Sequence, residues 1–459
     1  MIAIAKNFRE KHFTLFVGIV TALVVLATLC SGVLPATAQT PAQVGQWEGP
    51  ISWPWVSIHM ILLPSGKILF FDFPDNVFAG ETATVWNPTD GSFTAVPNRD
   101  TDLFCAGHAY LPDGRPFIVG GNLIPGAGLV DSNIFDEVTN TWTLTAPMAH
   151  PRWYPSVTTL PDGRILVMSG SDSCETCIVA RPEVYDSTTN TWKYLLADPN
   201  DNSADKILPL YPHTFVLPDG RVFVSSASRQ SIVSTVLSLA DPSHPTWTTV
   251  DNGHNYDAHS AVMYAPGKIM KSGTAADVGV STANAKATTY VIDMNLPSPS
   301  WRGPMEGVAS MKNPRAFHTL TLLPDGTVLA TGGGKTVDGI NEANAVFEAE
   351  LWSPITETWT TMASMQIPRL YHGNALLLQD GRVLVSGGGR FGTEPQLTAE
   401  IYSPPYLFKG PRPTITSAPG AGVYGATVFV GTPDAAQITA VSFMALGAAT
   451  HGLTTRSAS

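Results

Sequence analysis

Short apolar runs separated by tight glycine turns repeat along most of the chain. In the stretch from Arg369 to Gly389, an apolar run, an Asp380-Gly381 turn and a second apolar run follow one another. This order predicts two antiparallel strands joined by a tight turn. The same order recurs as LLPSGKILFF, LPDGRPFIVGG, LPDGRILVMSG, LPDGRVFVSSA, APGKIMKSG, LPDGTVLATGG and LQDGRVLVSGG. The pattern therefore predicts seven hairpins of one kind.

The spacing of these hairpins predicts how they are arranged. Their turn glycines are about 52 residues apart on average, and they are Gly66, Gly114, Gly163, Gly220, Gly267, Gly326 and Gly381. This is the period of kelch-type propeller blades. A second strand pair follows most hairpins, as in IFDEVTNTWTL, VYDSTTNTWKY and ELWSPITETWTTM. We expect Trp142, Trp192 and Trp359 in these segments to pack between neighbouring sheets.

The composition agrees with an all-β, seven-bladed kelch-type propeller. Only 14% of the residues are charged, whereas the chain has 40 glycines and 37 prolines. This suits many short strands joined by tight turns better than long amphipathic helices. We assign residues 39–410 to the propeller, which ends around IYSPPYLFKGPRP.

A different pattern begins near Thr414, with TITSAPGAGVYGATVFVGTP followed by ITAVSFMALGAATH. Short alternating strands of this kind are typical of the start of an immunoglobulin-like β-sandwich. Such a sandwich needs ~100 residues. From Thr414 on, 46 residues follow. We therefore expect residues 411–459 to form an incomplete, truncated sandwich domain.

The N-terminus has the order of a secretory signal peptide. Lys6, Arg9 and Lys11 precede an apolar run over 13–29, and the small-residue motif Ala36-Thr37-Ala38 follows it. We predict cleavage after Ala38, so that residues 1–38 are a signal peptide and the chain is secreted, extracellular or periplasmic. A transmembrane anchor is the alternative, but the run is short for crossing a bilayer.

The charge excludes some partners. The net charge is −11, and residues 1–38 contribute +2, so the chain after cleavage carries about −13. A negative chain does not suit nucleic acid or an anionic membrane as a partner. We expect a monomer with no membrane contact after signal cleavage.

Three cysteines remain after the predicted cleavage: Cys105, Cys174 and Cys177. In an oxidising compartment Cys174-Glu175-Thr176-Cys177 favours a small disulfide loop, with metal binding or redox chemistry as other uses of this spacing. Cys105 then has no disulfide partner. It is either inert in the core, bonded to another molecule, or used chemically.

The turn glycines serve as a common reference for height in the channel. Cys105 is nine residues before Gly114, and Tyr154 is nine before Gly163. These two residues should therefore lie level on adjacent blades. Tyr371 and His372, ten and nine residues before Gly381, should reach the same rim. Tyrosine and histidine side chains also fill propeller channels with satisfied hydrogen bonds, so the register alone does not establish a functional site.

Five sequence blocks carry a resemblance. FCAGHAYLPDGR, PRWYPSVTTLPDGR, AFHTLTLLPDG, RLYHGNALLLQDGR and LGAATHGLT closely resemble, in this order, blocks of the galactose oxidase and glyoxal oxidase family of copper-radical oxidases. The resemblance covers nearly all of the chain after residue 38. It implies a seven-bladed kelch-type propeller followed by a galactose-oxidase-like early-set sandwich.

The resemblance also implies a site. One copper ion would be bound by Tyr154, Tyr371, His372 and His451, the last of these on a loop that the sandwich domain sends up the channel. Cys105 would be joined to Tyr154 by a thioether, and the cross-linked phenol would hold a radical. Tyr371 would act as general base. Oxidising a C–H and O–H pair removes two electrons, whereas one copper ion takes one, so a second redox group is required. Imidazole and phenolate ligands suit Cu(II).

Several residues are candidates for the substrate rim. Galactose oxidases have a tryptophan over the thioether where this chain has Asp172, so another aromatic must shield it. We consider Trp53, Trp55 and Trp153, although strand alternation should turn Trp153 away from the site and into the core. His318, in the AFHT block, is the substrate-facing histidine that we favour.

Four other histidines recur near the starts of inner strands. They are His59, His108, His213 and His259. Some could orient the ligands from behind. For most of them we expect packing or hydrogen bonding to a neighbouring blade.

These observations predict a secreted mononuclear copper oxidase. It would oxidise a small aldehyde or primary alcohol and reduce O2 to hydrogen peroxide. The alternative is a non-catalytic kelch-type propeller that binds glycan or protein through its rim loops. A glycan hydrolase is weakly supported, because the register places no pair of carboxylates at the mouth.

Overall fold

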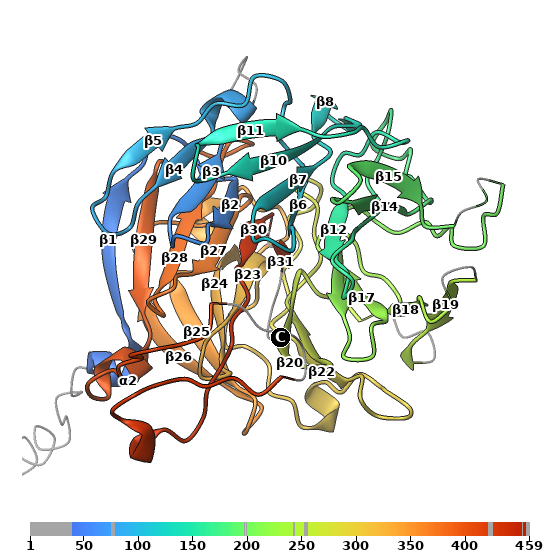
Figure 1. The fold of residues 1–459 in the computed structure, drawn as a ribbon. Coiled ribbons are helices and arrows are strands. Elements are labelled where there is room, and N and C mark those ends of the chain that lie inside the picture. Colours follow the sequence, from blue (N-terminus) through green and yellow to red (C-terminus); the bar gives the residue numbers. More distant parts are fainter. Residues whose placement is uncertain are drawn as a thin grey trace, which may run out of the picture.

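The computed structural model describes residues 39–74, 79–196, 198, 200–241, 244–251, 256–420, 426–451 and 453–455. The predicted signal peptide lies outside these residues. Seven sheets stand around a central axis, which confirms the predicted all-β, seven-bladed propeller (Figure 1). In each blade the innermost strand runs toward a turn glycine and the second strand returns from it.

Blades 1 to 4 each contain four strands in antiparallel order. Blade 1 is β2 (His59–Leu62), β3 (Ile68–Phe71), β4 (Thr84–Trp86) and β5 (Phe93–Ala95). Blade 2 is β6 (Gly107–Tyr110), β7 (Pro116–Val119), β10 (Ser132–Asp136) and β11 (Thr141–Leu144), with the hairpin β8 (Asn122–Ile124) and β9 (Ala127–Gly128) beside it. Blade 3 is β12 (Ser156–Thr159), β13 (Ile165–Met168), β14 (Glu183–Asp186) and β15 (Thr191–Tyr194). Blade 4 is β16 (Pro212–Val216), β17 (Val222–Ala227), β18 (Thr235–Ser238) and β19 (Thr246–Thr249).

The remaining blades complete the ring. Blade 5 is β20 (Ser260–Ala265), β21 (Lys268–Ser272) and β22 (Thr289–Asp293). Blade 6 is β23 (Ala316–Leu322), β24 (Val328–Gly334), β25 (Glu348–Ser353) and β26 (Thr358–Ser364). Blade 7 is β27 (Gly373–Leu377), β28 (Val383–Gly387), β29 (Thr398–Ser403) and the N-terminal strand β1 (Gln46–Ser52). The N-terminal strand therefore closes the ring against the last blade.

Helices are few and short. They are α2 (Pro41–Val44) and the 3-10 turns η1 (Ala79–Thr82), η3 (Pro304–Glu306), η4 (Glu342–Asn344), η5 (Pro405–Phe408) and η6 (Ala435–Gln437). Within the residues that the structure describes, no helix has the length and apolar character needed to span a bilayer.

Tryptophans tie each blade to the one before it. The indole N–H of Trp142 donates to the carbonyl of Val96, and that of Trp192 donates to Ser132 Oγ. Trp359 donates to Thr289 Oγ1 in the same way. Their rings are partly buried against the core clusters between sheets, which confirms the predicted packing role.

Buried arginines fix the entry to three inner strands. Arg152, Arg315 and Arg369 follow the prolines of HPRWY, NPRAF and IPRLY, and all three are buried. They pair with Glu183, Glu350 and Glu400 on the third strands of the same blades. Each glutamate also accepts two backbone N–H groups from the incoming loop. The buried charges are thus paired and hydrogen-bonded, as their burial requires.

A C-terminal hairpin occupies the centre of the ring. It consists of β30 (Ala448–Thr450) and β31 (Leu453–Thr455), and β30 pairs with β2 of blade 1 (Figure 1). Thr450 lies opposite His59 in this register. The segment after the propeller therefore enters the channel beside the inner strand of blade 1 and brings His451 to the axis.

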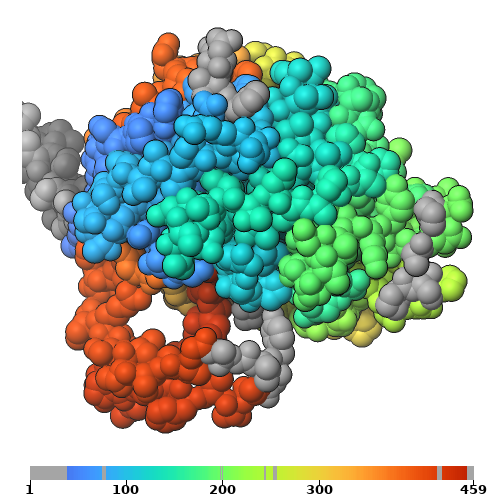
Figure 2. All heavy atoms as spheres, turned by 45° about the horizontal axis from the view of Figure 1, so that its top comes forward, coloured from blue at the N-terminus to red at the C-terminus, as the bar shows by residue number. Residues whose placement is uncertain are grey.

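The segment between blade 7 and this hairpin stands away from the propeller around an open gap (Figure 2). Its described residues form η6 and one β-bridge between Ser417 and Gly431, with no named strand between β29 and β30. Ile415, Phe429, Val441 and Phe443 are exposed along it. The immunoglobulin-like sandwich over residues 411–459 stays a prediction.

The buried ion pairs lead to a stability prediction. Replacing Arg315 with methionine leaves the Glu350 carboxylate buried without its charge partner, so the free energy of unfolding should fall by about 3–5 kcal/mol. Denaturant unfolding followed by fluorescence measures it. Arg302→Gln is the matched control, because Arg302 pairs with Glu357 at the surface between blades 5 and 6. It should cost less than about 1 kcal/mol. Equal losses in both variants would contradict the role of burial.

Candidate metal centre

One register position supplies much of the rim. The residues nine places before the seven turn glycines are Ser57, Cys105, Tyr154, Tyr211, Ala258, Phe317 and His372. Five of these seven have positive φ, in contrast to the residues of the strands that follow. The chain therefore bends sharply at the same height in most blades before it enters the inner strand.

Backbone hydrogen bonds link three of these residues from one blade to the next around the rim. Cys105, Tyr154 and Tyr211 have φ of 61°, 60° and 48°, in the left-handed region. The backbone N–H of Tyr154 donates to the Cys105 carbonyl, and that of Tyr211 donates to the Tyr154 carbonyl, both at 2.9 Å. His59 Nε2 accepts the Cys105 N–H at 3.2 Å. Cys105 and Tyr154 are thus held side by side on adjacent blades, as the register predicts.

Four side chains, two of them from this set of rim residues, converge at one point. The Tyr371 and Tyr154 hydroxyl oxygens are 2.8 Å apart, and Tyr154 Oη is 3.0 Å from His451 Nε2. His451 Nε2 is in turn 3.0 Å from His372 Nε2. The four residues come from blade 3, blade 7 and the C-terminal hairpin, so the tertiary fold alone brings them together.

The hydrogen bonds at the far sides of the imidazoles determine which nitrogens are bare. His372 Nδ1 lies 2.8 Å from the Gly389 carbonyl, which can only accept, so Nδ1 carries the hydrogen. Thr450 Oγ1 donates to the Ile58 carbonyl and therefore accepts from His451 Nδ1 at 2.6 Å. Both Nε2 atoms are consequently lone-pair nitrogens, and they face each other. Two lone pairs in such close contact repel unless a proton or a cation lies between them.

Burial keeps these groups neutral. It lowers the pKa of His372 to about 3, and it lowers the pKa of His451 far below its usual value. Burial likewise raises the pKa of Tyr154 and of Tyr371 above the ordinary phenol value. Neutral imidazoles are competent ligands, whereas the phenols need a cation nearby before they ionise.

The donor set fits one metal ion. Metal–imidazole bonds are about 2.0–2.1 Å long, so two ligand atoms at right angles around an ion lie about 2.9 Å apart. The three successive donor distances here are 2.8, 3.0 and 3.0 Å. No group of three or more His, Cys, Asp or Glu side chains suited to a metal occurs in the described part of the chain. The site depends on phenol oxygens, which favour a mixed N,O environment.

The Cys105 thiol lies beside one of the phenols. It is fully buried, and burial raises its pKa, while a side-chain hydrogen bond with Tyr154 acts in the opposite direction. His59 supports the cysteine backbone and contacts His108, with His59 Nδ1 3.0 Å from His108 Nε2. These two histidines act from behind the site and do not join the four donors.

Aromatic rings enclose Tyr154. The Trp153 ring stacks on it at 3.8 Å and 13°, and the Tyr211 ring stacks at 4.3 Å and 23°. Two near-parallel rings this close to a third cannot share one of its faces, so Tyr154 is enclosed on both. Trp153 belongs to the core, but the expectation that it turns away from Tyr154 is wrong. It lies before the start of β12, where strand alternation does not yet apply.

Trp53 does not shield the site. Trp53 is buried among Phe70, Trp86 and Phe93 of blade 1, and Trp55 packs against the same cluster. This cluster lies between blades 1 and 7 rather than over Tyr154. The sequence-based proposal for Trp53 is therefore wrong, and that for Trp55 stays a prediction.

His318 is not on an open substrate rim. It is fully buried, and its Nε2 lies 2.9 Å from Ser272 Oγ of blade 5. The preceding residue, Phe317, instead meets the Tyr371 ring edge-on at 5.6 Å. Phe391 is partly exposed, and its ring is 6.2 Å from that of Tyr371. These two phenylalanines border the site where the sequence argument placed a histidine.

The loop after β13 carries the remaining predicted residues. A disulfide joins Cys174 and Cys177. Asp172 is half-buried, and its carboxylate accepts from Ser173 Oγ. Glu175, between the two cysteines, pairs with Arg229 at 2.6 Å.

Arg229 is a neighbour of the site that sequence reasoning missed. Its guanidinium lies 5.4 Å from the Tyr154 ring centroid and 5.7 Å from that of Trp153. The motif around it, SASRQS, follows β17 and has no spacing signal of its own. Tyr211, in contrast, could have been found, because it is nine residues before Gly220.

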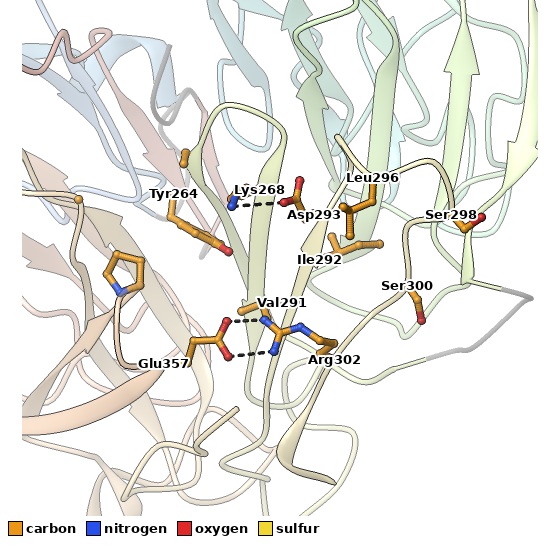
Figure 3. A pocket seen from close by; sticks show the side chains of 13 residues that line it. Tyr264, Lys268, Val291, Ile292, Asp293, Leu296, Ser298, Ser300, Arg302 and Glu357 are labelled. Atoms are coloured by element: carbon orange, nitrogen blue, oxygen red, sulfur yellow. Dashed lines mark hydrogen bonds and ion pairs between the residues drawn. The ribbon is translucent and has the colours of Figure 1, made fainter. Parts of the chain in front are cut away.

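A surface cavity lies elsewhere in the molecule. Its volume is about 510 Å³, and it is lined by residues of blades 5 and 6 that include the Lys268–Asp293 and Arg302–Glu357 ion pairs (Figure 3). None of the four converging donors lines it. Its charged groups are already paired with one another, so it offers no unpaired charge for a ligand.

Comparison with known proteins agrees with this arrangement. The model of the family described as "Glyoxal oxidase N-terminus" matches residues 87–406, which is more than half of the chain. The chain belongs to this family. The match includes Cys105, Tyr154, Tyr371 and His372, whereas His451 lies beyond it.

Individual proteins similar to this chain include oxidases of two kinds. A galactose oxidase of Gibberella zeae strain PH-1 is 30% identical over 452 residues, covering 91% of this chain and 64% of that protein. An aldehyde oxidase of Arabidopsis thaliana is 25% identical, covering 83% of this chain and 70% of that protein. The chain thus spans somewhat less than two thirds of the galactose oxidases that it matches.

A solved structure shows the same fold. It is a fungal alcohol oxidase in complex with copper, with a TM-score of 0.73 and 22% identity, covering 90% of this chain and 89% of that one.

The cysteines of this family member give a labelling prediction. Cys174 and Cys177 should react with an alkylating reagent only after mild reduction, because the disulfide withholds both thiols. Cys105 should stay unlabelled in the native protein even then, because it is buried and its thiol pKa is raised. Peptide mapping identifies each site. Labelling of Cys174 or Cys177 before reduction would contradict the disulfide.

Proposed function

We propose that this protein is a mononuclear copper oxidase of small aldehydes or primary alcohols. The observation that carries the proposal is the convergence of two bare imidazole nitrogens and two phenol oxygens, with a buried thiol beside one phenol. The family and the galactose and aldehyde oxidase relatives support it. So does the fold shared with a copper-containing alcohol oxidase.

The overall reaction is a two-electron oxidation. A primary alcohol and O2 would yield an aldehyde and H2O2, or an aldehyde hydrate and O2 would yield a carboxylic acid and H2O2. The substrate loses one hydrogen from carbon and one from oxygen, and O2 gains both. One copper ion accepts one electron when bound, so the chain itself must supply a second redox group.

Cys105 and Tyr154 would form that second group. Their side chains are within hydrogen-bond reach, and among the described residues Cys105 is the one cysteine outside the disulfide. A thioether between them would extend the phenol π-system and make loss of an electron easier. Trp153 and Tyr211 would exclude water from both faces of the ring.

The four ligands would be His372, His451, Tyr154 and Tyr371. The two phenols differ in access, because Tyr154 is buried whereas Tyr371 is partly exposed. Tyr371 would therefore face the substrate and take the proton from its hydroxyl, as a general base must lie within hydrogen-bond reach of that proton. Tyr154 would remain shielded as the redox partner.

Export through a signal peptide belongs to the same proposal. The disulfide in the loop after β13 supports an oxidising compartment. N-terminal sequencing of the mature protein tests cleavage after Ala38.

The thioether leads to the main test of function. After exposure to copper and O2, which accepts the two hydrogens lost from the thiol and the phenol ring, the intact mass should fall by two hydrogens, and peptide mapping should recover a branched peptide that joins Cys105 to Tyr154. The Cys105→Ser variant should fold and bind copper but lack both features. Its kcat/KM for peroxide production from methylglyoxal or a primary alcohol should fall by about 100-fold or more, because the group removed acts only in the reaction.

Two outcomes decide between the radical oxidase and the non-catalytic propeller. Peroxide production by Cys105→Ser at the parental rate would show that the radical mechanism is wrong. If neither protein makes peroxide and no branched peptide forms, the non-catalytic propeller that binds ligands through its rim becomes the better proposal.

The ligand set gives a second prediction. His372→Ala should weaken copper binding and abolish turnover while the propeller stays folded, because a rigid strand entry presents this nitrogen. His318→Ala is the matched control, since it removes a buried histidine outside the donor cluster and should keep one copper per chain. Metal analysis after dialysis measures both. Full copper content in His372→Ala would remove His372 from the site.

A further inference from the structure

Arg229, a charged residue outside the proposed ligand set, lies beside the proposed redox tyrosine. Its guanidinium carbon is 5.4 Å from the Tyr154 ring centroid. An arginine remains protonated at any ordinary pH. A permanent positive charge therefore stands beside Tyr154 whatever the state of the other groups.

Two carboxylates hold this cation in place. Asp277, in the loop after β21, accepts from Arg229 Nε at 2.9 Å and from Nη2 at 2.5 Å. Glu175, in the disulfide loop of blade 3, accepts from Nη2 at 2.6 Å. Arg229 itself follows β17 of blade 4. Three blades thus contribute to one fixed position, and the arginine side chain is only 18% exposed.

The arginine charge and the charges of its two carboxylate partners differ in their exposure to solvent. The guanidinium also lies 5.7 Å from the Trp153 ring, so it contacts the stacked pair as a unit. The side chains of Glu175 and Asp277 are 55% and 35% exposed, whereas that of Arg229 is 18% exposed. Solvent therefore screens the two negative charges more than the arginine charge, and their opposing effect on Tyr154 is weaker.

We propose that the positive charge of Arg229 raises the one-electron reduction potential of Tyr154. Glu175 and Asp277 hold the arginine in the position from which its charge acts. This inference rests on the proposed function, in which copper holds Tyr154 as a phenolate. In the measurement the phenolate gives one electron to the electrode and no proton moves, so its charge changes from −1 to 0. A nearby cation stabilises the charged reduced form more than the neutral oxidised form.

The direction in which the reduction potential of Tyr154 shifts in two variants distinguishes an electrostatic role of Arg229 from a structural one. Arg229→Gln removes the cation and leaves two carboxylates, so Tyr154 should be oxidised more readily. Glu175→Gln removes a negative charge and should shift the potential in the opposite direction, by a smaller amount. A purely structural role would move both variants in the same direction, because both break the same ion pair.

The experiment is a spectroelectrochemical measurement on the copper-loaded, cross-linked protein, with the radical absorption as readout. At one applied potential, the ratio of oxidised to reduced Tyr154 should be about tenfold higher in Arg229→Gln than in the parent, equal to 59 mV for a one-electron couple. Arg229→Lys should restore a ratio within about twofold of the parent, since it keeps the charge.

Arg181→Gln is the matched control. Arg181 also lies over a tyrosine ring, 4.9 Å from that of Tyr194, and pairs with Asp205. Its removal should leave the Tyr154 ratio unchanged.

Three results would overturn the inference. They are an unchanged ratio in Arg229→Gln, shifts of the same sign in Arg229→Gln and Glu175→Gln, and an equal shift in Arg181→Gln. In each case the proposed function stands as long as the parent forms the radical. A parent that forms neither thioether nor radical would refute the proposed function and this inference with it.

Discussion

The buried arginine–glutamate pairs are the interactions on which the centre depends. Arg152 stands two residues before Tyr154, and Arg369 stands two residues before Tyr371. Each guanidinium binds carbonyl groups of its own blade, at Ser169 and at Gly387. The backbone is therefore clamped just ahead of the phenol that it must present. A flexible loop at this point would leave the phenol oxygens free to separate.

This arrangement explains how much of the centre could be predicted from the sequence. The repeat of turn glycines establishes the blades, and a fixed count back from each glycine locates the rim. Cys105, Tyr154 and His372 follow from that count, and Tyr211 follows from it equally well. The count works because each inner strand pairs with the strand that returns from its own turn, so residues equally far from the turns lie at similar heights.

The failures have one physical origin, which is that loops and interfaces lack this regular register. Strand alternation was applied to Trp153, although the left-handed conformation of Tyr154 interrupts the strand pattern there. Trp53 was judged by residue type, whereas burial against Phe70 and Trp86 determines its position. Arg229 meets Glu175 and Asp277 from three different blades, and no local spacing encodes such a meeting. The position of His451 likewise depends on pairing between β30 and β2.

The pairing of β30 with β2 has a consequence for the order of events during synthesis. Cys105 and Tyr154 emerge from the ribosome early and adjacent blades can bring them together, but His451 emerges about 300 residues after Tyr154. The ring also cannot close until β29 is available to β1. The nascent protein therefore carries a thiol and a phenol in contact before it has a complete set of ligands. In the proposed centre, His451 would therefore arrive only after most of the propeller has been made, so that oxidation would begin when aromatic rings already surround Tyr154.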